Sequence, residues 1–351
     1  KRSYKRDISE QSINFLKNLL NNSENSDHRL RALWSLHIVS SYVDTDFEKL
    51  LNDKDEYIRG WSIKHIAEDK IVSNSVLEKF KTLSDSDNSP FVRLELASAI
   101  QRVDFNKRWD VLESLVLKSE DIEDNNIPHM IWFALEPLVP IDAYRALILA
   151  NNSQIPMITE YVARRLADAD LLYPIVENIK NSNKVDLLLE GILGSIEGNL
   201  EIKPPSNWEE VYKSLKLDNK TSNKALQISQ LFGSNEATVE FLKILENKNE
   251  NDEKRIKALN SLSIKSPSEV SPLIPELFME DQMRIPVIRS IQNIEDNDML
   301  IYSLIYNFDG KQGDVIPFDY SDYNSQEKIA IIQMMASKSS TANILLNSLK
   351  N

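Results

Sequence analysis

The chain contains no cysteine among its 351 residues. This absence excludes disulfide bonds, thiol nucleophiles, thiolate metal ligands and covalent attachment of a c-type haem within this chain. Glycine is also scarce, with 7 residues, which disfavours barrels, sandwiches and glycine-rich phosphate loops. No apolar stretch approaches the roughly 20 residues that a membrane-spanning helix needs. We therefore expect no cofactor in this chain and no direct membrane insertion.

Recognised catalytic patterns are missing as well. The sequence has no G-x-S-x-G, G-x-G-x-x-G or Walker pattern, and its acidic runs lack the spacing of a calcium loop. None of the four histidines, His28, His37, His65 and His129, falls in an arrangement that directs two imidazoles at one metal. His37 and His65 fall on neighbouring predicted helices, where a shared face is conceivable, but core packing or hydrogen bonding is their ordinary role. We expect no metal site and no enzymatic activity of the chain itself.

The charge balance limits the kinds of partner. The formal net charge is −13, with 42% hydrophobic and 27% charged residues, a composition typical of a globular protein. An acidic surface repels phosphate backbones, so we do not expect nucleic acid as a partner. The chain opens at Lys1 with neither an initiator Met nor a signal peptide, which suggests a processed protein or a segment of a longer one.

A short phrase recurs with its spacing intact. Residues 53–59 and 87–93 each begin with an aspartate and end with an arginine, preceded by an aromatic and a β-branched residue. The arginines of the two phrases lie 34 residues apart, and Arg31 lies 28 residues before the first of them. A period of this length with helical patterning predicts a HEAT- or armadillo-like solenoid of helical hairpins. In such repeats an arginine early in the second helix pairs with an acid in the preceding turn, so we expect the structural pairs Arg59–Asp53 and Arg93–Asp87.

Helical periodicity runs through the first part of the chain. Apolar residues recur on one face over 28–41, 57–67 and 91–103, and shorter amphipathic stretches at 47–51 and 76–80 lie between them. A capping serine followed by proline at Ser89-Pro90 predicts a helix start. No segment has the pattern of a strand. The fold class we expect is an all-α superhelix of roughly nine or ten helix pairs.

The organisation changes near residue 200. Three glycines (Gly191, Gly194, Gly198) precede the stretch Lys203-Pro204-Pro205-Ser206. We therefore divide the chain into HEAT-like repeats over 1–200 and further helical repeats over 201–351. A second sub-array with an irregular insert at 309–325 is one interpretation of the latter part. In the second part we predict helices at 225–232, 237–246, 254–263, 269–279, 284–294, 298–307, 327–337 and 342–349.

The most polar constellation lies in the middle of the first part. His129, Trp132 and Glu136 follow one another at helical spacing, and Arg164-Arg165 end the next equivalent helix. These five residues are our candidate binding site, since equivalent helices of adjacent repeats stand side by side. A base and a cation there would suit an acidic substrate. The alternative is structural, with Glu136 in an inter-repeat ion pair with one of the arginines and Trp132 in the core.

Several phrases in order resemble a known family. The phrases are Arg31-Ala-Leu-Trp-Ser-Leu-His37, Tyr57-Ile-Arg-Gly-Trp61, Ser89 to Ala97, Asp124 to Glu136 and Ala163-Arg-Arg-Leu166. Together they resemble the HEAT region of membrane-bound dehydrogenase-type proteins of planctomycetes and Bacteroidetes. In that family a β-propeller precedes the HEAT region and a cytochrome c module follows it. The opening Arg2-Ser-Tyr-Lys-Arg6 resembles the last strand of such a propeller.

The resemblance implies a function without chemistry in this chain. It suggests a non-catalytic scaffold in a periplasmic or otherwise extracytoplasmic redox protein, with neighbouring domains or another subunit as protein partners. The motifs that would carry haem, quinone cofactor or calcium are absent from the sequence. A free-standing HEAT-type protein that binds a peptide or protein is the alternative. A hydrolase or lyase centred on His129, Glu136 and Arg164 is a third possibility.

Overall fold

The computed structural model describes residues 8–39, 44–68, 72–196, 202–294, 298–305, 316 and 320–348. Over these residues the fold is all-α, with no β-strand, and neighbouring helices pack in pairs as a helical repeat does. The predicted fold class is thereby confirmed. The chain forms two compact units, Lys1–Ser195 and Ile196–Asn351, where the sequence analysis placed a change near residue 200.

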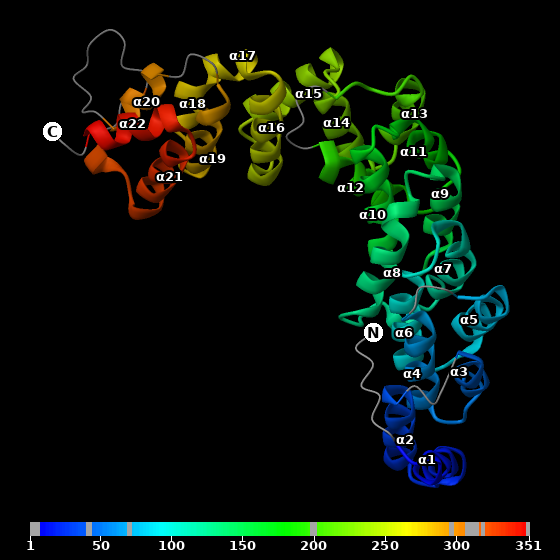
Figure 1. Cartoon of the computed structure of the whole chain (residues 1–351). Coiled ribbons are helices and arrows are strands. Elements are labelled where there is room, and N and C mark those ends of the chain that lie inside the picture. Colours follow the sequence, from blue (N-terminus) through cyan, green and yellow to red (C-terminus); the bar gives the residue numbers. More distant parts are fainter. Residues whose placement is uncertain are drawn as a thin grey trace. The chain divides into compact units, whose positions relative to one another are not determined.

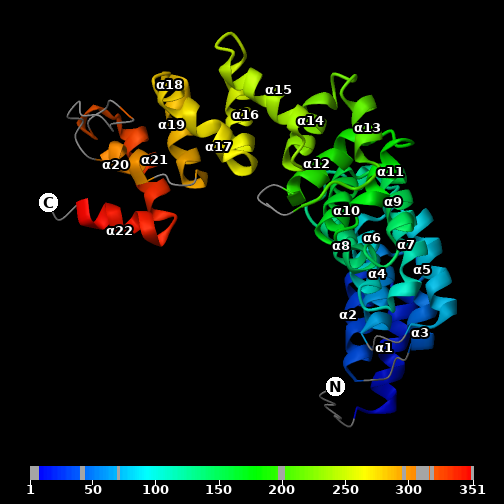
Figure 2. The same ribbon diagram turned by 90° about the horizontal axis from the view of Figure 1, so that it is seen from above.

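The first unit consists of two layers of helices. Its helices are α1 (Glu10–Asn22), α2 (Ser26–Ile38), α3 (Asp44–Leu50), α4 (Glu56–Ala67), α5 (Asn74–Ser86), α6 (Pro90–Ile100), α7 (Trp109–Leu115), α8 (Ile127–Leu135), α9 (Ala143–Asn152), α10 (Pro156–Asp168), α11 (Leu172–Ile179) and α12 (Val185–Ile196). From α3 onward, odd-numbered helices lie along one side and even-numbered helices along the other, as both ribbon views show (Figures 1 and 2). Consecutive even helices also contact one another from α2 to α10, so the repeats are joined within a layer as well as across it.

The second unit repeats the pairing. Its helices are α13 (Trp208–Leu215), α14 (Ser222–Leu231), α15 (Asn235–Glu246), α16 (Asp252–Lys265), α17 (Pro267–Val270), α18 (Ile274–Phe278), α19 (Asp281–Ser290), α20 (Asp298–Ile305), α21 (Ser325–Ala336) and α22 (Ser339–Ser348). The helices α14, α16, α19 and α21 contact one another in succession, and the short 3₁₀ turn Ile291–Asn293 also contacts α16 and α21. The helices α15, α18 and α22 pack against this row. The helices expected at 225–232, 237–246 and 254–263 are therefore present as α14, α15 and α16.

Side chains in the turns fix where the helices begin and end. Ser89 caps α6 by accepting a hydrogen bond from the Val92 N–H, and Pro90 occupies the first helical position, as predicted. Gly233 ends α14 in the left-handed conformation, with φ of 81°. Its N–H donates to Gln230 O while the Ser234 N–H donates to Ser229 O, the pattern of a Schellman motif.

The core lies between the two layers of each unit. In the first unit Leu33, Ile63 and Leu96, from three successive even helices, are fully buried, as is Phe80 of α5. Burying one such side chain contributes about 1.5–3 kcal/mol relative to leaving it exposed. One side of each even helix is therefore committed to the core, and the opposite side is free for other contacts.

Some sequence predictions fall on residues outside the described ranges. These are the propeller-like opening at 2–6, Gly198, and most of the irregular insert at 309–325. The last residues of that insert are described, and they form a 3₁₀ turn at Tyr320–Asp322 and the start of α21.

Candidate functional site

The repeated arginines reach forward along the array, which differs from the predicted pairing. Arg59 donates from Nε and a terminal nitrogen to the carboxylate of Asp87, at 2.7 and 2.8 Å. Arg93 does the same to Asp121, at 2.6 Å for both bonds. The expected carboxylate partners were Asp53 for Arg59 and Asp87 for Arg93. That assignment was wrong because a period identifies equivalent positions but does not say in which direction a long side chain extends.

The preceding turn is still contacted, through its backbone. A second terminal nitrogen of Arg59 donates to the Asp53 carbonyl oxygen at 2.8 Å, and Arg93 reaches the Asp87 carbonyl at 3.1 Å. Each guanidinium therefore ties the turn before its own helix to the turn before the next equivalent helix. Such two-pronged contacts match the fixed fork of the guanidinium and are the strong kind of charge-assisted hydrogen bond.

Five arginines each donate to an earlier carbonyl oxygen and to an acid before or at the start of the next equivalent helix, and we call them the arginine ladder. Four of them make a two-pronged contact with the acid, whereas Arg284 donates once to Glu327 and once to Asp281 of its own helix. The first-unit members are Arg29, Arg59 and Arg93, with Asp53, Asp87 and Asp121 as acceptors, and the second-unit members are Arg255 and Arg284, with Glu280 and Glu327 as acceptors. Every one is the fourth residue of its helix and follows the N-cap residue by four positions. The repeat pattern in the sequence pointed to Arg31 instead of Arg29. It did not indicate the two second-unit members, because neither Arg255 nor Arg284 has an acid six residues earlier.

The charge state of the ladder follows from its contacts. Burial opposes ionisation of Asp53, but hydrogen bonds from Arg29 and from the Asp55 N–H outweigh it and lower the pKa of Asp53. Hydrogen bonding to Arg255 likewise lowers the pKa of Glu280. These two carboxylates are thus held ionised at neutral pH, as ion pairs between repeats.

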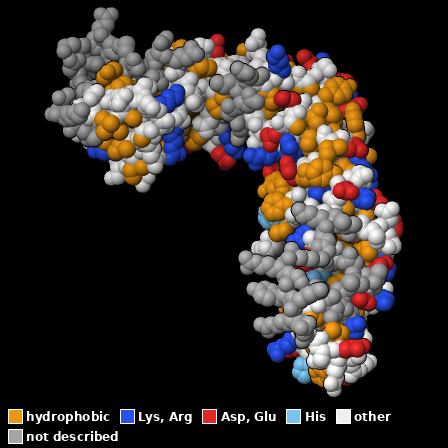
Figure 3. All heavy atoms as spheres, viewed as in Figure 1, with side chains coloured by type: hydrophobic (Ala, Val, Ile, Leu, Met, Phe, Trp, Pro, Cys, Tyr) orange, Lys and Arg blue, Asp and Glu red, His pale blue; other side chains and the backbone are white. Residues whose placement is uncertain are grey.

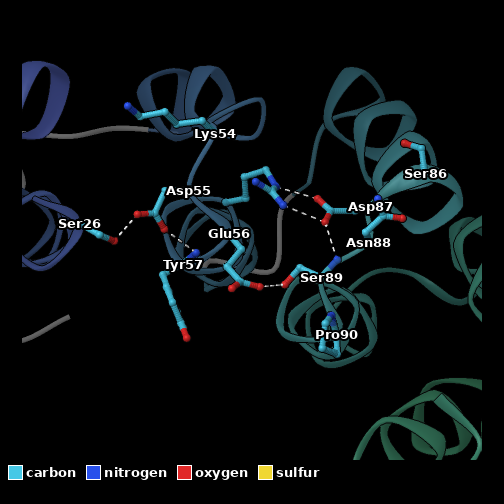
Figure 4. Close-up of a pocket in the computed structure, with 11 residues that line it drawn as sticks. Ser26, Lys54, Asp55, Glu56, Tyr57, Ser86, Asp87, Asn88, Ser89 and Pro90 are labelled. Carbon is cyan, nitrogen blue, oxygen red and sulfur yellow. Dashed lines mark hydrogen bonds and ion pairs between the residues drawn. The ribbon is translucent and has the colours of Figure 1, made fainter. Parts of the chain in front are cut away.

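A polar pocket of the first unit lies along these turns (Figure 4). Its acidic residues are already engaged between helices. The Ser26 hydroxyl donates to the Asp55 carboxylate, and the Ser89 hydroxyl donates to Glu56. Because the carboxylates already accept hydrogen bonds from neighbouring repeats, this pocket is part of the inter-repeat structure.

The free sides of α2, α4, α6, α8 and α10 form a second surface, which we call the even-helix face. Aromatic side chains of different helices contact one another along it. The pairs and their ring-centroid separations are Trp34–Trp61 at 5.0 Å, Tyr57–Phe91 at 5.2 Å and Trp132–Tyr161 at 5.4 Å. Tyr57 is 48% exposed and Phe133 of α8 is 54% exposed. Figure 3 shows hydrophobic side chains at the surface where α8 and α10 lie.

The residues of the predicted polar constellation lie on this face, and each makes different contacts. Glu136 accepts a hydrogen bond from Arg165 Nε at 2.5 Å, which is the inter-repeat ion pair considered as the alternative. Trp132 packs edge-on against Tyr161 at half-buried depth. Arg164 lies against Gly194 of α12. His129 is exposed and has no hydrogen bond or ion pair to any residue that the structure describes.

A small pocket between α4, α6 and α8 adds a carboxylate to the face. Glu95 lines it together with Lys64, Arg102 and Met130. Burial raises the pKa of Glu95, while the two cations oppose the shift. Sequence patterning did not single out this residue, because a lone glutamate at a helical position has no distinguishing spacing.

None of the helices in the described ranges is both long and apolar enough to cross a membrane. No protein-family model and no curated protein matches this chain. Among solved structures the chain is similar to the crystal structure of an engineered protein, with 12% identity over 97% of this chain and 92% of the other and a TM-score of 0.28. A likeness at that level supports no conclusion about function.

Proposed function

We propose that this chain is a non-catalytic HEAT-type protein-binding module, and that its even-helix face holds another protein. The observation that carries the proposal is the row of partly exposed aromatic side chains across successive even helices. Tyrosine and tryptophan are over-represented among the residues that dominate protein–protein binding energy. Their rings are already held by contacts between helices, so little side-chain entropy is lost on binding.

Charged groups on the same face would supply specificity. Arg164 and His129 are exposed beside the aromatic rings, and Glu95 offers a half-buried carboxylate. An aromatic centre with polar and charged groups around it is the usual composition of a protein-binding surface. The chain's net charge of −13 disfavours nucleic acid as a partner.

We further propose, on the family resemblance, that the partner is a neighbouring domain or subunit of an extracytoplasmic redox protein. In that arrangement the module would hold a dehydrogenase propeller and an electron-accepting cytochrome in register. Reading the coding region on either side of the chain tests this extension. If neither a β-propeller nor a C-x-x-C-H haem motif is encoded there or in an adjoining gene, the extension fails. The binding proposal would remain, as a free-standing protein- or peptide-binding module.

Site-specific photocrosslinking tests the binding face itself. A benzoylphenylalanine placed at Phe133, on the even-helix face, is expected to crosslink one protein in stoichiometric amount in the source cell. The matched control position is Ile148 of α9, in the same unit but on the odd side, where the side chain is 60% exposed. Crosslinks of equal yield at both positions, or none at Phe133, would contradict the proposal.

A further inference from the structure

Two histidines and a glutamate meet at the ends of α2 and α4. His37 lies in the last turn of α2 and His65 in the last turn of α4, and Glu68 is the C-cap residue of α4. The two imidazole rings stack with centroids 3.7 Å apart. We call these three residues the histidine cluster.

The ligand atoms of the cluster already converge. His37 Nε2 lies 3.0 Å from one oxygen of Glu68, and His65 Nδ1 lies 3.2 Å from the other. One ligand atom from each residue falls within 4.8 Å of the other two. Ligands bound to Zn²⁺ at about 2.0–2.1 Å in tetrahedral geometry lie about 3.4 Å from one another. To bind one ion the cluster must contract to that spacing, and the part-exposed His37 ring must tilt out of its stack on His65, because a metal lies in the plane of each imidazole that binds it.

The rings are held from outside the cluster. Phe47 of α3 packs against both imidazoles, at centroid distances of 5.7 Å from His37 and 5.2 Å from His65. Trp61 packs against His65 at 5.5 Å. Because His65 is only 7% exposed, packing restrains its ring, whereas Glu68 and His37 keep an open side toward solvent. The cluster is therefore fixed on its protein side and accessible on the other.

The electrostatic setting favours a cation. Both histidines lie at helix C-termini, where the exposed carbonyl groups carry partial negative charge. Glu68 adds a full negative charge at the same end of α4, where a carboxylate is unfavourable without a positive partner. Two imidazole nitrogens with one carboxylate oxygen suit borderline metals such as Zn²⁺. Three protein ligands also leave a fourth position for water.

We propose that His37, His65 and Glu68 bind one divalent transition-metal ion, for which Zn²⁺ is the representative probe, and that the ion joins α2 to α4. Such a link would tie the ends of two successive even helices at the border of the even-helix face. The proposal does not depend on the identity of the protein partner. Its direct consequence is that the metal stabilises the first unit, because an ion that binds only the folded state shifts the folding equilibrium.

Calorimetric titration of ZnCl₂ into the full chain, prepared without a polyhistidine tag, tests the proposal. We expect one equivalent to bind with a rise in melting temperature, and Co²⁺ in place of Zn²⁺ to give visible d–d absorption bands. His37→Ala and Glu68→Gln change accessible ligands, so both variants should fold, which circular dichroism checks. Each should weaken Zn²⁺ binding more than tenfold and abolish the rise in melting temperature.

His28→Ala and His129→Ala are the matched controls, since both histidines are exposed and lie outside the cluster. They should bind Zn²⁺ as the unmodified chain does. The proposal is overturned if the full chain binds no Zn²⁺, if His37→Ala and Glu68→Gln bind it unchanged, or if the control variants lose it equally.

Discussion

The two units use the same ladder with different acids. In the first unit the acceptors are aspartates in the turn ahead of the next even helix. Asp53 lies two residues before the N-cap residue Asp55, and Asp87 lies two residues before the N-cap residue Ser89. In the second unit the acceptors are glutamates of the helix start itself. Glu280 is the N-cap of α19, and Glu327 is the third residue of α21, where it also accepts from the Asn324 N–H. A longer side chain can reach the same guanidinium from a position nearer the helix.

The comparison separates what the array needs from what varies. The arginine position is constant, at the fourth residue of the helix, whereas the acid can move by several residues if its length changes. Among the described residues, the second unit has no counterpart of the three aromatic contacts that join even helices in the first. The second unit also contains no histidine. The ladder is therefore the shared structural device, and the aromatic face and the histidine cluster are features of the first unit alone.

Breaking a ladder pair should have the largest effect. Arg93 and Asp121 are each only 2% exposed in their side chains, so Arg93→Ala leaves a buried carboxylate without its partner. We expect the free energy of unfolding of the first unit to fall by about 3–5 kcal/mol. Arg255→Ala should cost the second unit less, because Glu280 is 14% exposed and can recover hydration. Urea denaturation followed by tryptophan fluorescence measures the first effect, since four of the five tryptophans lie in the first unit.

The double variant Arg93→Met with Asp121→Leu is the control. Replacing both partners removes the unpaired charge and should restore most of the loss. If Arg93→Ala unfolds within 1 kcal/mol of the unmodified chain, the ladder does not hold the array together.

The second-largest expected effect is a dependence of stability on pH in the first unit. Burial, together with the charge of His37, lowers the pKa of His65 to about 4 from an ordinary value of 6.5. Between pH 6.5 and pH 4 the imidazole of His65 binds a proton in the unfolded chain but not in the folded chain. The contribution of neutral His65 to the free energy of unfolding is therefore fully present above pH 6.5 and is lost as the pH falls to about 4. The expected loss between pH 7 and pH 5 is about 2 kcal/mol for the first unit.

Pulse proteolysis with peptide mapping, in buffer containing a metal chelator, follows both units at once. The second unit contains no histidine and should therefore change less over that window. His65→Asn should flatten the profile of the first unit. A profile unchanged by that substitution would remove His65 as the cause.

Two glycines of α12 offer a smaller test of packing in the first unit. A side chain at Gly191 would meet the Glu160 backbone oxygen and Ala163 of α10, whereas one at Gly194 would meet only the flexible end of Arg164. We expect Gly191→Ala to destabilise the unit by about 1–3 kcal/mol through overpacking. Gly194→Ala should stabilise it by about 0.5–1 kcal/mol, because alanine favours the helix. Equal melting temperatures for the two variants would show that α10 and α12 do not approach so closely.

Local patterns were enough to predict the fold. Apolar spacing located most helices, and Ser89-Pro90 marked a helix start that the structure confirms. The partners of the ladder could not be predicted, because they depend on how far one helix is displaced along its neighbour. A Ser, Asp or Asn four positions before an arginine is a local signal that finds Arg29, Arg59, Arg93 and Arg255. It misses Arg284, whose N-cap Glu280 makes no side-chain cap bond, and it also selects arginines outside the ladder, such as Arg31 and Arg108.

The candidate site was less predictable for the same reason. Spacing along one helix put His129, Trp132 and Glu136 on a common side, but only the packed repeats show that Glu136 meets Arg165. Glu68 was not singled out, since its significance comes from His37, which belongs to another helix. Residues whose role arises from contacts between repeats leave little trace in the sequence.

The binding face is tested most directly by the affinity of the partner that the crosslink at Phe133 identifies. Phe133→Ser removes a 54% exposed side chain and should change stability by no more than about 0.5 kcal/mol. Titration calorimetry should show at least tenfold weaker binding for Phe133→Ser, and binding within twofold of the unmodified chain for Ile148→Ser. Equal affinity of both variants for that partner would contradict the account.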